Sequence, residues 1–257
     1  MPAGSFSSRL CACWRLKAAL AAIVCFTFCV PYFLIGNFPL LPVRELPLTR
    51  LDRAIGFHPY AWVWIYQSEY LIVNAIPWLA RRRDELIRYV RGFAVLSLVS
   101  FIVFLLFPIR APKPAVNNPT GMYWLLQLYD VPTNSLPSLH AGMVVFTLAF
   151  GNRIVGSDVG RWVKLLFILW GGLILYGTLA TKEHYVVDIV TGVLLALIVD
   201  RWTWSRGLAE DAEQQRADVP AARVEVMIGA ADGKDLARQV EQVGQQNAAA
   251  VVRAERG

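Results

Sequence analysis

Six apolar stretches, each close to the roughly 20 residues that a helix needs to cross a bilayer, constrain the fold of this chain more than any other feature. They cover approximately residues 18–36, 59–79, 92–109, 137–153, 163–180 and 184–201. The chain is 56% hydrophobic and only 17% charged, which is too apolar for an ordinary soluble domain. We therefore expect an all-α polytopic membrane protein with six transmembrane helices in a bundle.

The first apolar stretch follows Arg9, Arg15 and Lys17, as the core of a signal peptide would. Its apolar core is long, however, and Pro31-Tyr32-Phe33-Leu34 stands where the small residues of a cleavage site are expected. A retained first helix is the better interpretation.

Lysines and arginines beside the stretches predict the orientation in the membrane. One side carries thirteen of them, namely Arg9, Arg15, Lys17, Arg81, Arg82, Arg83, Arg88, Arg91, Arg153, Arg161, Lys164, Arg201 and Arg206. The other side carries six, namely Arg44, Arg50, Arg53, Arg110, Lys113 and Lys182. Both termini are therefore expected in the cytoplasm, in a plasma or inner membrane. The loop before Pro137 and the turn at 181–184 then face the extracytoplasmic side.

This topology divides the chain into a cytoplasmic N-terminus (1–17), a six-helix membrane domain (18–206) and a cytoplasmic tail (207–257). The tail is rich in Ala, Glu, Gln and Arg, so we expect it to be mobile or partly helical. The Pro-rich residues 37–58 lie along the interface or cover the site. The net charge of +6 comes from residues beside the apolar stretches, which favours membrane topology over nucleic-acid binding.

All four cysteines, Cys11, Cys13, Cys25 and Cys29, lie before or inside the first stretch. None lies in a loop expected to face an oxidising compartment, so no disulfide framework is predicted. Cys11 and Cys13 lack a second ligand pair nearby, which argues against a zinc site.

The run Pro137-Ser138-Leu139-His140 stands at the start of the fourth stretch. Proline suits the first turn of a helix, and free N–H groups of Ser138 and Leu139, with the Ser138 hydroxyl, would form an anion cradle there. His140 is near enough to exchange a proton with a bound phosphate. The alternative is a polar helix cap at the membrane interface.

His184 and Asp188 are four residues apart at the start of the sixth stretch, so they share one helix face. The carboxylate can accept a proton from one imidazole nitrogen and leave the other nucleophilic. The alternative is a structural hydrogen bond between packed helices. Ionisable groups at such places are costly, which makes a functional site the default interpretation.

Arg110 and Lys113 are the cations of the outer loop that leads to Pro137, and they are candidates to bind a phosphate. Interfacial anchoring is the alternative. Lys182 is a further candidate, although a solvated turn lysine fits equally well. Asn134 either orients the motif or caps a turn.

Pro137-Ser138-Leu139-His140-Ala141-Gly142, together with Thr181-Lys182-Glu183-His184-Tyr185-Val186-Val187-Asp188, resembles the type 2 phosphatidic acid phosphatase superfamily. The resemblance covers roughly residues 92–201. It implies that His184 attacks phosphorus to form a phosphohistidine, that Asp188 orients it, and that His140 protonates the leaving group. Ser138, Leu139, Arg110 and Lys113 would bind phosphate, and no metal or other cofactor is implied.

Three departures narrow the resemblance. The superfamily often has Gly where Leu139 stands. Gly177 and Thr178 stand where the superfamily often has a Ser-Arg pair, and the lysine-to-Arg-Pro spacing of its first motif is not met around Arg110. These features look like the branch of inositol phosphorylceramide synthases, which combines a Pro-Ser-Leu-His run with a Thr-x-x-His-Tyr-x-x-Asp run. Members of that branch move a phosphoryl-alcohol group between lipids.

The expected function is therefore that of a membrane lipid phosphatase or phosphotransferase acting on a lipid phosphate or phospholipid. Hydrolysis is favoured slightly because water is always available as acceptor. A transferase like inositol phosphorylceramide synthase is the first alternative. A non-catalytic lipid-binding or transport protein is the second, but transport sites usually lie near the bilayer midplane. A soluble vanadate-dependent oxidase shares the superfamily's site; the six stretches and the missing arginine argue against it.

Overall fold

The computed structural model describes residues 6–129, 133–217 and 242, and its contacts divide the chain into residues 1–205 and 206–257. The elements in chain order are α1 (Phe6–Cys11), α2 (Trp14–Asn37), β1 (Arg44–Glu45), α3 (Arg50–Ala54), α4 (Pro59–Gln67), α5 (Glu69–Ala75), η1 (Ile76–Leu79), α6 (Arg83–Leu106), β2 (Ile109–Arg110), α7 (Gly121–Tyr129), α8 (Leu139–Val155), η2 (Gly156–Asp158), α9 (Arg161–Ala180) and α10 (Val186–Ala217).

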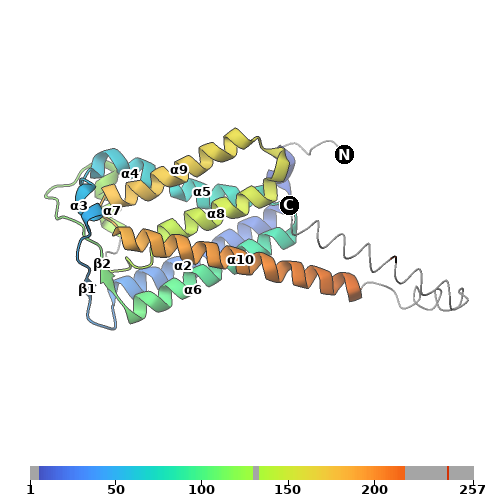
Figure 1. Cartoon of the computed structure of the whole chain (residues 1–257), viewed down its shortest axis with the longest axis horizontal. Coiled ribbons are helices and arrows are strands. Elements are labelled where there is room, and N and C mark those ends of the chain that lie inside the picture. Colours follow the sequence, from blue (N-terminus) through green and yellow to red (C-terminus); the bar gives the residue numbers. More distant parts are fainter. Residues whose placement is uncertain (1–5, 130–132, 218–241, 243–257) are drawn as a thin grey trace, which may run out of the picture. The chain divides into compact units, whose positions relative to one another are not determined.

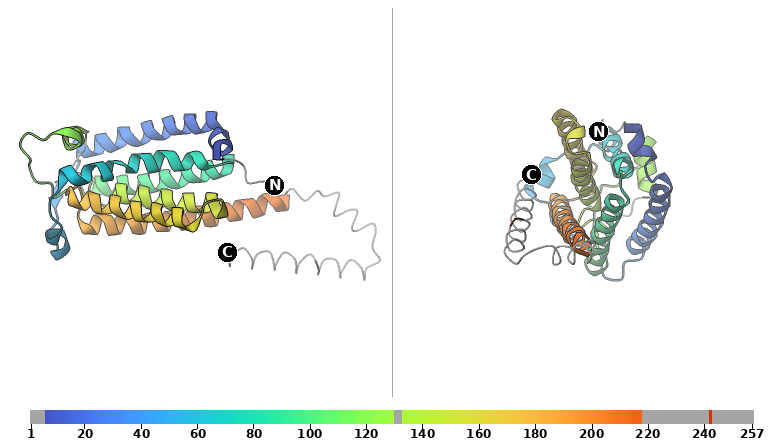
Figure 2. Two further views of the ribbon diagram at one scale, coloured as in Figure 1. Left: turned by 90° about the horizontal axis from the view of Figure 1, so that it is seen from above. Right: turned by 90° about the vertical axis from the view of Figure 1, so that its right-hand side faces the viewer.

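The long helices of the first unit lie side by side and form an elongated bundle (Figures 1 and 2). Helix α8 is central, because it packs against α5, η1, α6 and α9, while α2 lies at an edge and packs on α6. Aromatic rings fill the centre: Tyr89 stacks on Phe146 with ring centroids 5.5 Å apart, and its hydroxyl bonds to Thr147 at 2.9 Å. The expectation of a mostly helical bundle is confirmed; the short pair β1 and β2 is the exception among the described residues.

Within the part of the chain that the structure describes, four helical segments are long and apolar enough to cross a membrane: Trp14–Asn37, Arg83–Leu106, Leu139–Asp158 and Arg161–Ala180. They correspond to the first, third, fourth and fifth predicted stretches. Helix α2 begins at Trp14, so it includes Lys17, which was predicted to lie before the first stretch. Helix α10 carries Asp188, Asp200 and Arg201 within its apolar part and is not among the four.

The second predicted stretch, 59–79, is broken into α4, α5 and η1. The first break falls at Ser68, whose hydroxyl donates to the Ile65 carbonyl at 2.5 Å and accepts from Trp170 Nε1 at 2.9 Å. Serine bonds of this kind compete with the helical ladder. Pro77 then lies in the tighter turn of η1. A count of residue types shows an apolar run, but it does not reveal these local breaks.

Helix α8, which corresponds to the fourth predicted stretch, begins at Leu139. The expectation that Pro137 occupies its first turn was therefore wrong. Ser138 is the N-cap, and its side chain accepts from the Ala141 N–H at 3.2 Å. Serine is favoured at this position because its oxygen satisfies an N–H that the first turn leaves free. Pro137 precedes the cap, joined to Leu136 by a cis peptide bond.

Residues 44–55 pack against the turn before α10. Strand β1 pairs in parallel with β2, with Glu45 opposite Arg110. Asp52 forms a capping box with Thr49 at the start of α3, and its other carboxylate oxygen accepts from the Val186 N–H at 2.8 Å. The Leu46 N–H donates to the Tyr185 hydroxyl at 3.3 Å. This outer segment therefore supports the residues that follow His184.

The opposite end of the bundle is held by basic side chains. Arg9 pairs with Asp158 at 2.5 Å, and the buried Lys17 ammonium donates to the carbonyls of Arg9 and Trp78, each at 2.7 Å. Beyond this unit, α10 continues to Ala217. Most of the predicted tail, at 218–241 and 243–257, lies outside the described residues.

Candidate active site

The two histidines of the sequence motifs face each other. His140 lies in the first turn of α8 and His184 in the turn before α10, and their ring centroids are 5.5 Å apart at an interplanar angle of 64°. Their side chains are almost fully buried, at 8% and 4% exposed. The pairing of two motifs 44 residues apart is therefore a feature of the fold.

Asp188 is fully buried and contacts His184 directly. Its Oδ2 accepts from the Tyr185 N–H at 2.8 Å and from the Ser135 hydroxyl, and lies 3.3 Å from His184 Nδ1. His184 precedes α10 and does not lie on it, but the four-residue spacing still brings the two side chains together. With Nδ1 turned to the carboxylate, Nε2 is the nitrogen that is left for chemistry.

Ser138 connects the two motifs through its backbone. Its N–H donates to the Asp188 carbonyl at 2.9 Å, so the prediction that this N–H is free for an anion was wrong. The cause is close helix packing: a Cβ added at Gly192 would lie only 2.2 Å from the Ser138 carbonyl oxygen. Leu139 is the first residue of α8, a position whose N–H has no partner within its own helix.

Two further residues contact His140, and the sequence analysis missed both. The Tyr66 hydroxyl shares a 2.8 Å hydrogen bond with His140 Nε2, and the Glu69 carboxylate binds His140 Nδ1. Both side chains are fully buried. Glu69 is the single charged residue within 59–79, and a charge inside a span marks a functional candidate. That signal was present in the sequence.

Lys113 reaches the site through a carboxylate. Its ammonium lies 2.6 Å from the Glu183 carboxylate. Glu183 is buried and directly precedes His184 in the sequence. Arg110 is exposed at the edge formed by β2. The contacts of the described residues do not bring the Arg110 guanidinium onto the histidines.

Lys182 and Asn134 hold the scaffold around the site. Lys182 has a left-handed backbone (φ 59°) and donates to the carbonyls of Asp52 and Ile55 at 2.6 and 2.7 Å. Burial lowers the pKa of Lys182, and nearby Asp52 partly offsets this. Asn134 donates to the Tyr32 carbonyl of α2 at 2.8 Å, a contact across 102 residues of chain and not a local turn cap.

The carboxylate of Asp52 is held ionised by its contacts. Burial alone raises its pKa, but hydrogen bonds from Thr49 and Val186 and the charge of Lys182 outweigh burial, so the pKa is lowered. The ion therefore persists at neutral pH and keeps α3 attached to the start of α10.

The position at which the superfamily often has an arginine is closed. Thr178 is fully buried, and its hydroxyl donates to the Leu175 carbonyl at 2.8 Å. Neighbouring Gly177 packs against Tyr66, to which an added Cβ would approach within 3.3 Å. The close packing of α4 against α9 therefore occupies the space at this position, and the residue that stands there carries no cationic side chain.

A family model described as PAP2 superfamily matches residues 44–201, which include both histidines, Glu69 and Asp188. The chain belongs to the PAP2 superfamily. Among solved structures, the crystal structure of LpxE from Aquifex aeolicus is similar, with a TM-score of 0.46 and 16% sequence identity over 60% of this chain and 93% of that one. No curated protein sequence matches significantly.

This membership, with the four apolar helices, indicates an integral membrane protein. The match is to the superfamily as a whole. The resemblance to the branch of inositol phosphorylceramide synthases stays a prediction.

Proposed function

We propose that this PAP2 superfamily member is a membrane lipid phosphatase or phosphotransferase that works through a phosphohistidine on His184. The observation that carries the proposal is the buried His184, with Nδ1 turned to Asp188 and its ring 5.5 Å from that of His140. A nucleophile, its orienting carboxylate and a second proton-transfer group are the parts that such a reaction needs.

The reaction proceeds in two displacements. Nε2 of His184 attacks phosphorus while the bond to the leaving oxygen breaks, and His140 gives that oxygen a proton. Water or a lipid alcohol then attacks the phosphohistidine, gives its proton to His140, and frees His184. Asp188 stabilises the charge that develops on the His184 ring.

Glu69 positions His140 in this scheme. Its carboxylate binds Nδ1, so the proton that moves is the one on Nε2. In the structure Nε2 bonds to the Tyr66 hydroxyl, and the leaving oxygen of the substrate takes the place of that bond.

Phosphate binding falls to groups at the same end of the bundle. The start of α8 offers the Leu139 N–H and the Ser138 hydroxyl, and Lys113 adds positive charge beside Glu183. Arg110 is assigned the outer part of the phosphate site because it is exposed at this end. Lys182 is left out, because backbone carbonyls hold its ammonium.

We place the site on the extracytoplasmic side, with six spans and cytoplasmic termini. Support comes from the basic residues Arg9, Arg81 and Arg153, which lie toward the end of the bundle away from the histidines. The broken segment α4–η1 and helix α10 then complete the six crossings. A broken helix is tolerated in a membrane where protein surrounds the break.

Transfer between lipids is the second candidate reaction. The observation that favours it is the buried Thr178, which stands where the superfamily often has an arginine. This departure is one of the features by which the chain resembles inositol phosphorylceramide synthases. A non-catalytic lipid-binding role is less well supported, because His140, His184 and Asp188 lie at or just before helix starts, whereas transport sites usually lie near the bilayer midplane.

The test is turnover of a panel of lipid phosphates by purified protein, with and without alcohol acceptors. Free phosphate indicates hydrolysis and a new phospholipid indicates transfer. We expect His184→Ala to abolish turnover and Asp188→Asn to lower it about 10⁴-fold, as loss of an orienting carboxylate does elsewhere. Full activity of purified His184→Ala would contradict the mechanism.

A further inference from the structure

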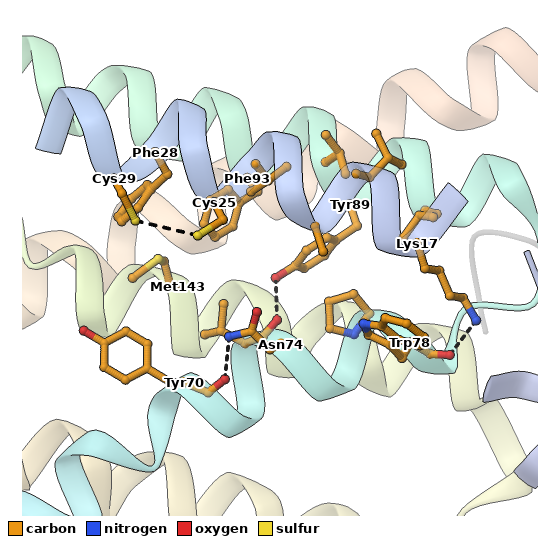
Figure 3. Close-up of a pocket in the computed structure, with 17 residues that line it drawn as sticks. Lys17, Cys25, Phe28, Cys29, Tyr70, Asn74, Trp78, Tyr89, Phe93 and Met143 are labelled. Atoms are coloured by element: carbon orange, nitrogen blue, oxygen red, sulfur yellow. Dashed lines mark hydrogen bonds between the residues drawn. The ribbon is translucent and has the colours of Figure 1, made fainter. Parts of the chain in front are cut away.

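A cavity of about 220 Å³ lies between α2 on one side and α5 with η1 on the other (Figure 3). Helix α6 and Met143 of α8 complete its walls. The gap exists because α2 packs along α6 whereas α5 packs on α8, so the two helices separate. The cavity is apart from the histidines, and nothing in the proposed mechanism uses it.

The walls of this cavity are chemically suited to hydrocarbon. Leu20, Val24 and Phe28 of α2 line the cavity on one side, and Val73 of α5 and Trp78 of η1 line it on the other. The polar groups are already bonded within the protein: the Asn74 amide donates to the Tyr70 carbonyl at 2.7 Å, and Tyr89 bonds to Thr147. Burying an anionic head group against these apolar walls would cost desolvation free energy without a compensating hydrogen bond. A hydrocarbon chain carries no polar group and incurs no such cost.

The cavity opens on the side that faces the bilayer. Cys25, Tyr70 and Asn74 line it and are themselves exposed. Helix α2 is one of the four candidate spans, and its outward residues Ile23 and Phe26 are apolar and more than half exposed. Helix α2 is long enough to cross the hydrocarbon core of a bilayer. An opening of the cavity beside its outward apolar residues is therefore in contact with lipid chains.

One end of the cavity adjoins the candidate site. Tyr70 follows Glu69 in the chain, and Met143 lies one helical turn along α8 from His140. The other end is closed where the Lys17 ammonium bonds to the Trp78 carbonyl. Lys17 and Cys29 are twelve residues apart on α2, so the lined length is about 18 Å at the helical rise.

We propose that this cavity binds a hydrocarbon chain of the lipid substrate while its phosphate lies between the two histidines. The inference rests on the proposed function and adds the place in the bundle where a hydrocarbon chain of the lipid phosphate binds. The volume is below that of most pockets that enclose a whole ligand. It therefore takes one chain and leaves the rest of the lipid in the bilayer.

The test compares Val24→Trp, which fills the cavity, with Ile23→Trp on the outer face of the same helix. Each purified variant is assayed in mixed micelles on a long-chain lipid phosphate and on a six-carbon analogue. We expect Val24→Trp to raise the KM for the long-chain substrate about tenfold, because excluding even two methylenes has that effect. The short substrate and Ile23→Trp should show wild-type KM.

A second pair of variants keeps the test valid if Val24→Trp does not fold. Val73 lines the cavity from α5 and is replaced in Val73→Trp, whereas Leu71 is exposed on the same helix and is replaced in Leu71→Trp. An equal KM change in lining and outer variants, or on long and short substrates, would overturn the proposal. Loss of all phosphate release in the wild-type protein would instead count against the proposed function.

Photolabelling separates these two failures, because it needs no turnover. A long-chain lipid phosphate with a diazirine in its chain should label peptides of α2 and α5 at the cavity, and excess unlabelled lipid phosphate should compete. Labelling should fall in Val24→Trp and persist in Ile23→Trp. Equal labelling by a photoreactive lipid without phosphate would assign the cavity to bulk membrane lipid and refute the substrate assignment.

Discussion

At the residue scale, the decisive contacts are those that fix the two imidazoles. Each histidine has a buried carboxylate on Nδ1: Asp188 for His184 and Glu69 for His140. A buried carboxylate is stable in such surroundings only when it is paired or hydrogen-bonded. In the proposed mechanism, this second pair holds His140 for proton transfer, as the first holds His184 for attack.

Replacing Glu69 with Gln tests this positioning role. We expect turnover of an alkyl phosphate to fall about 10²-fold, the lower range for loss of general acid catalysis. Turnover of p-nitrophenyl phosphate should fall much less, because its leaving group departs without a proton. The measurement is kcat for both substrates in the same preparation.

Asp200→Asn is the matched control, since Asp200 is also a buried carboxylate but pairs with Arg153. It should lower thermal stability without a leaving-group effect. Equal losses on both substrates in Glu69→Gln would show that Glu69 is structural only.

Sequence spacing was enough to predict one of these carboxylates and not the other. His184 and Asp188 are four residues apart, so local geometry alone predicts their contact. Glu69 meets His140 across 71 residues of chain, and Ser135 meets Asp188 across 53. Such contacts depend on how α5 packs on α8, which no short pattern reports.

At the element scale, the approach of α10 to the start of α8 aligns the site. Gly192 lies against the Ser138 carbonyl, and the Ser138 N–H donates to the Asp188 carbonyl. Apolar length predicted the helices themselves. It did not predict the break at Ser68 or the attachment of residues 44–55 near Tyr185, because both depend on individual hydrogen bonds.

Gly192→Ala should push these two helices apart. The added methyl would meet backbone, which cannot rotate away, so we expect a loss of about 1–3 kcal/mol of stability from overpacking. Phosphate release should fall as well, because Asp188 shifts with the helix. Thermal unfolding in detergent and an activity assay report the two effects.

Gly172→Ala in α9 is the control for helix propensity. A Cβ there has nothing within 4 Å, so the change should leave stability equal or slightly higher. If both glycine variants behaved alike, close packing at Ser138 would not be what matters.

At the scale of the whole molecule, one cluster of basic side chains and the two histidines lie at opposite ends of the bundle. Arg9, Arg81 and Asp158 meet at one end, and the histidines lie at the other, near β1 and β2. From this arrangement the positive-inside rule predicts a site on the extracytoplasmic side, as proposed above. Counting lysines and arginines along the sequence predicted that the basic cluster lies at the end away from the histidines. Such a count needs only residue positions relative to the apolar stretches and no knowledge of tertiary contacts.

Single cysteines introduced at the two ends, with the native cysteines replaced, test the orientation. Asn117→Cys, in the exposed loop before α7, should react with an impermeant maleimide on intact cells. Ser157→Cys, exposed at the far end, should react only after permeabilisation. The reverse pattern would place the site in the cytoplasm.

The most direct test of the central claim is the identification of the phosphorylated residue. Rapid quenching with a phosphate-labelled lipid substrate should trap an acid-labile, base-stable label, and mass spectrometry should locate it on His184. His184→Ala should carry none. A label on another residue, or steady turnover with no labelled protein at any quench time, would contradict the phosphohistidine mechanism.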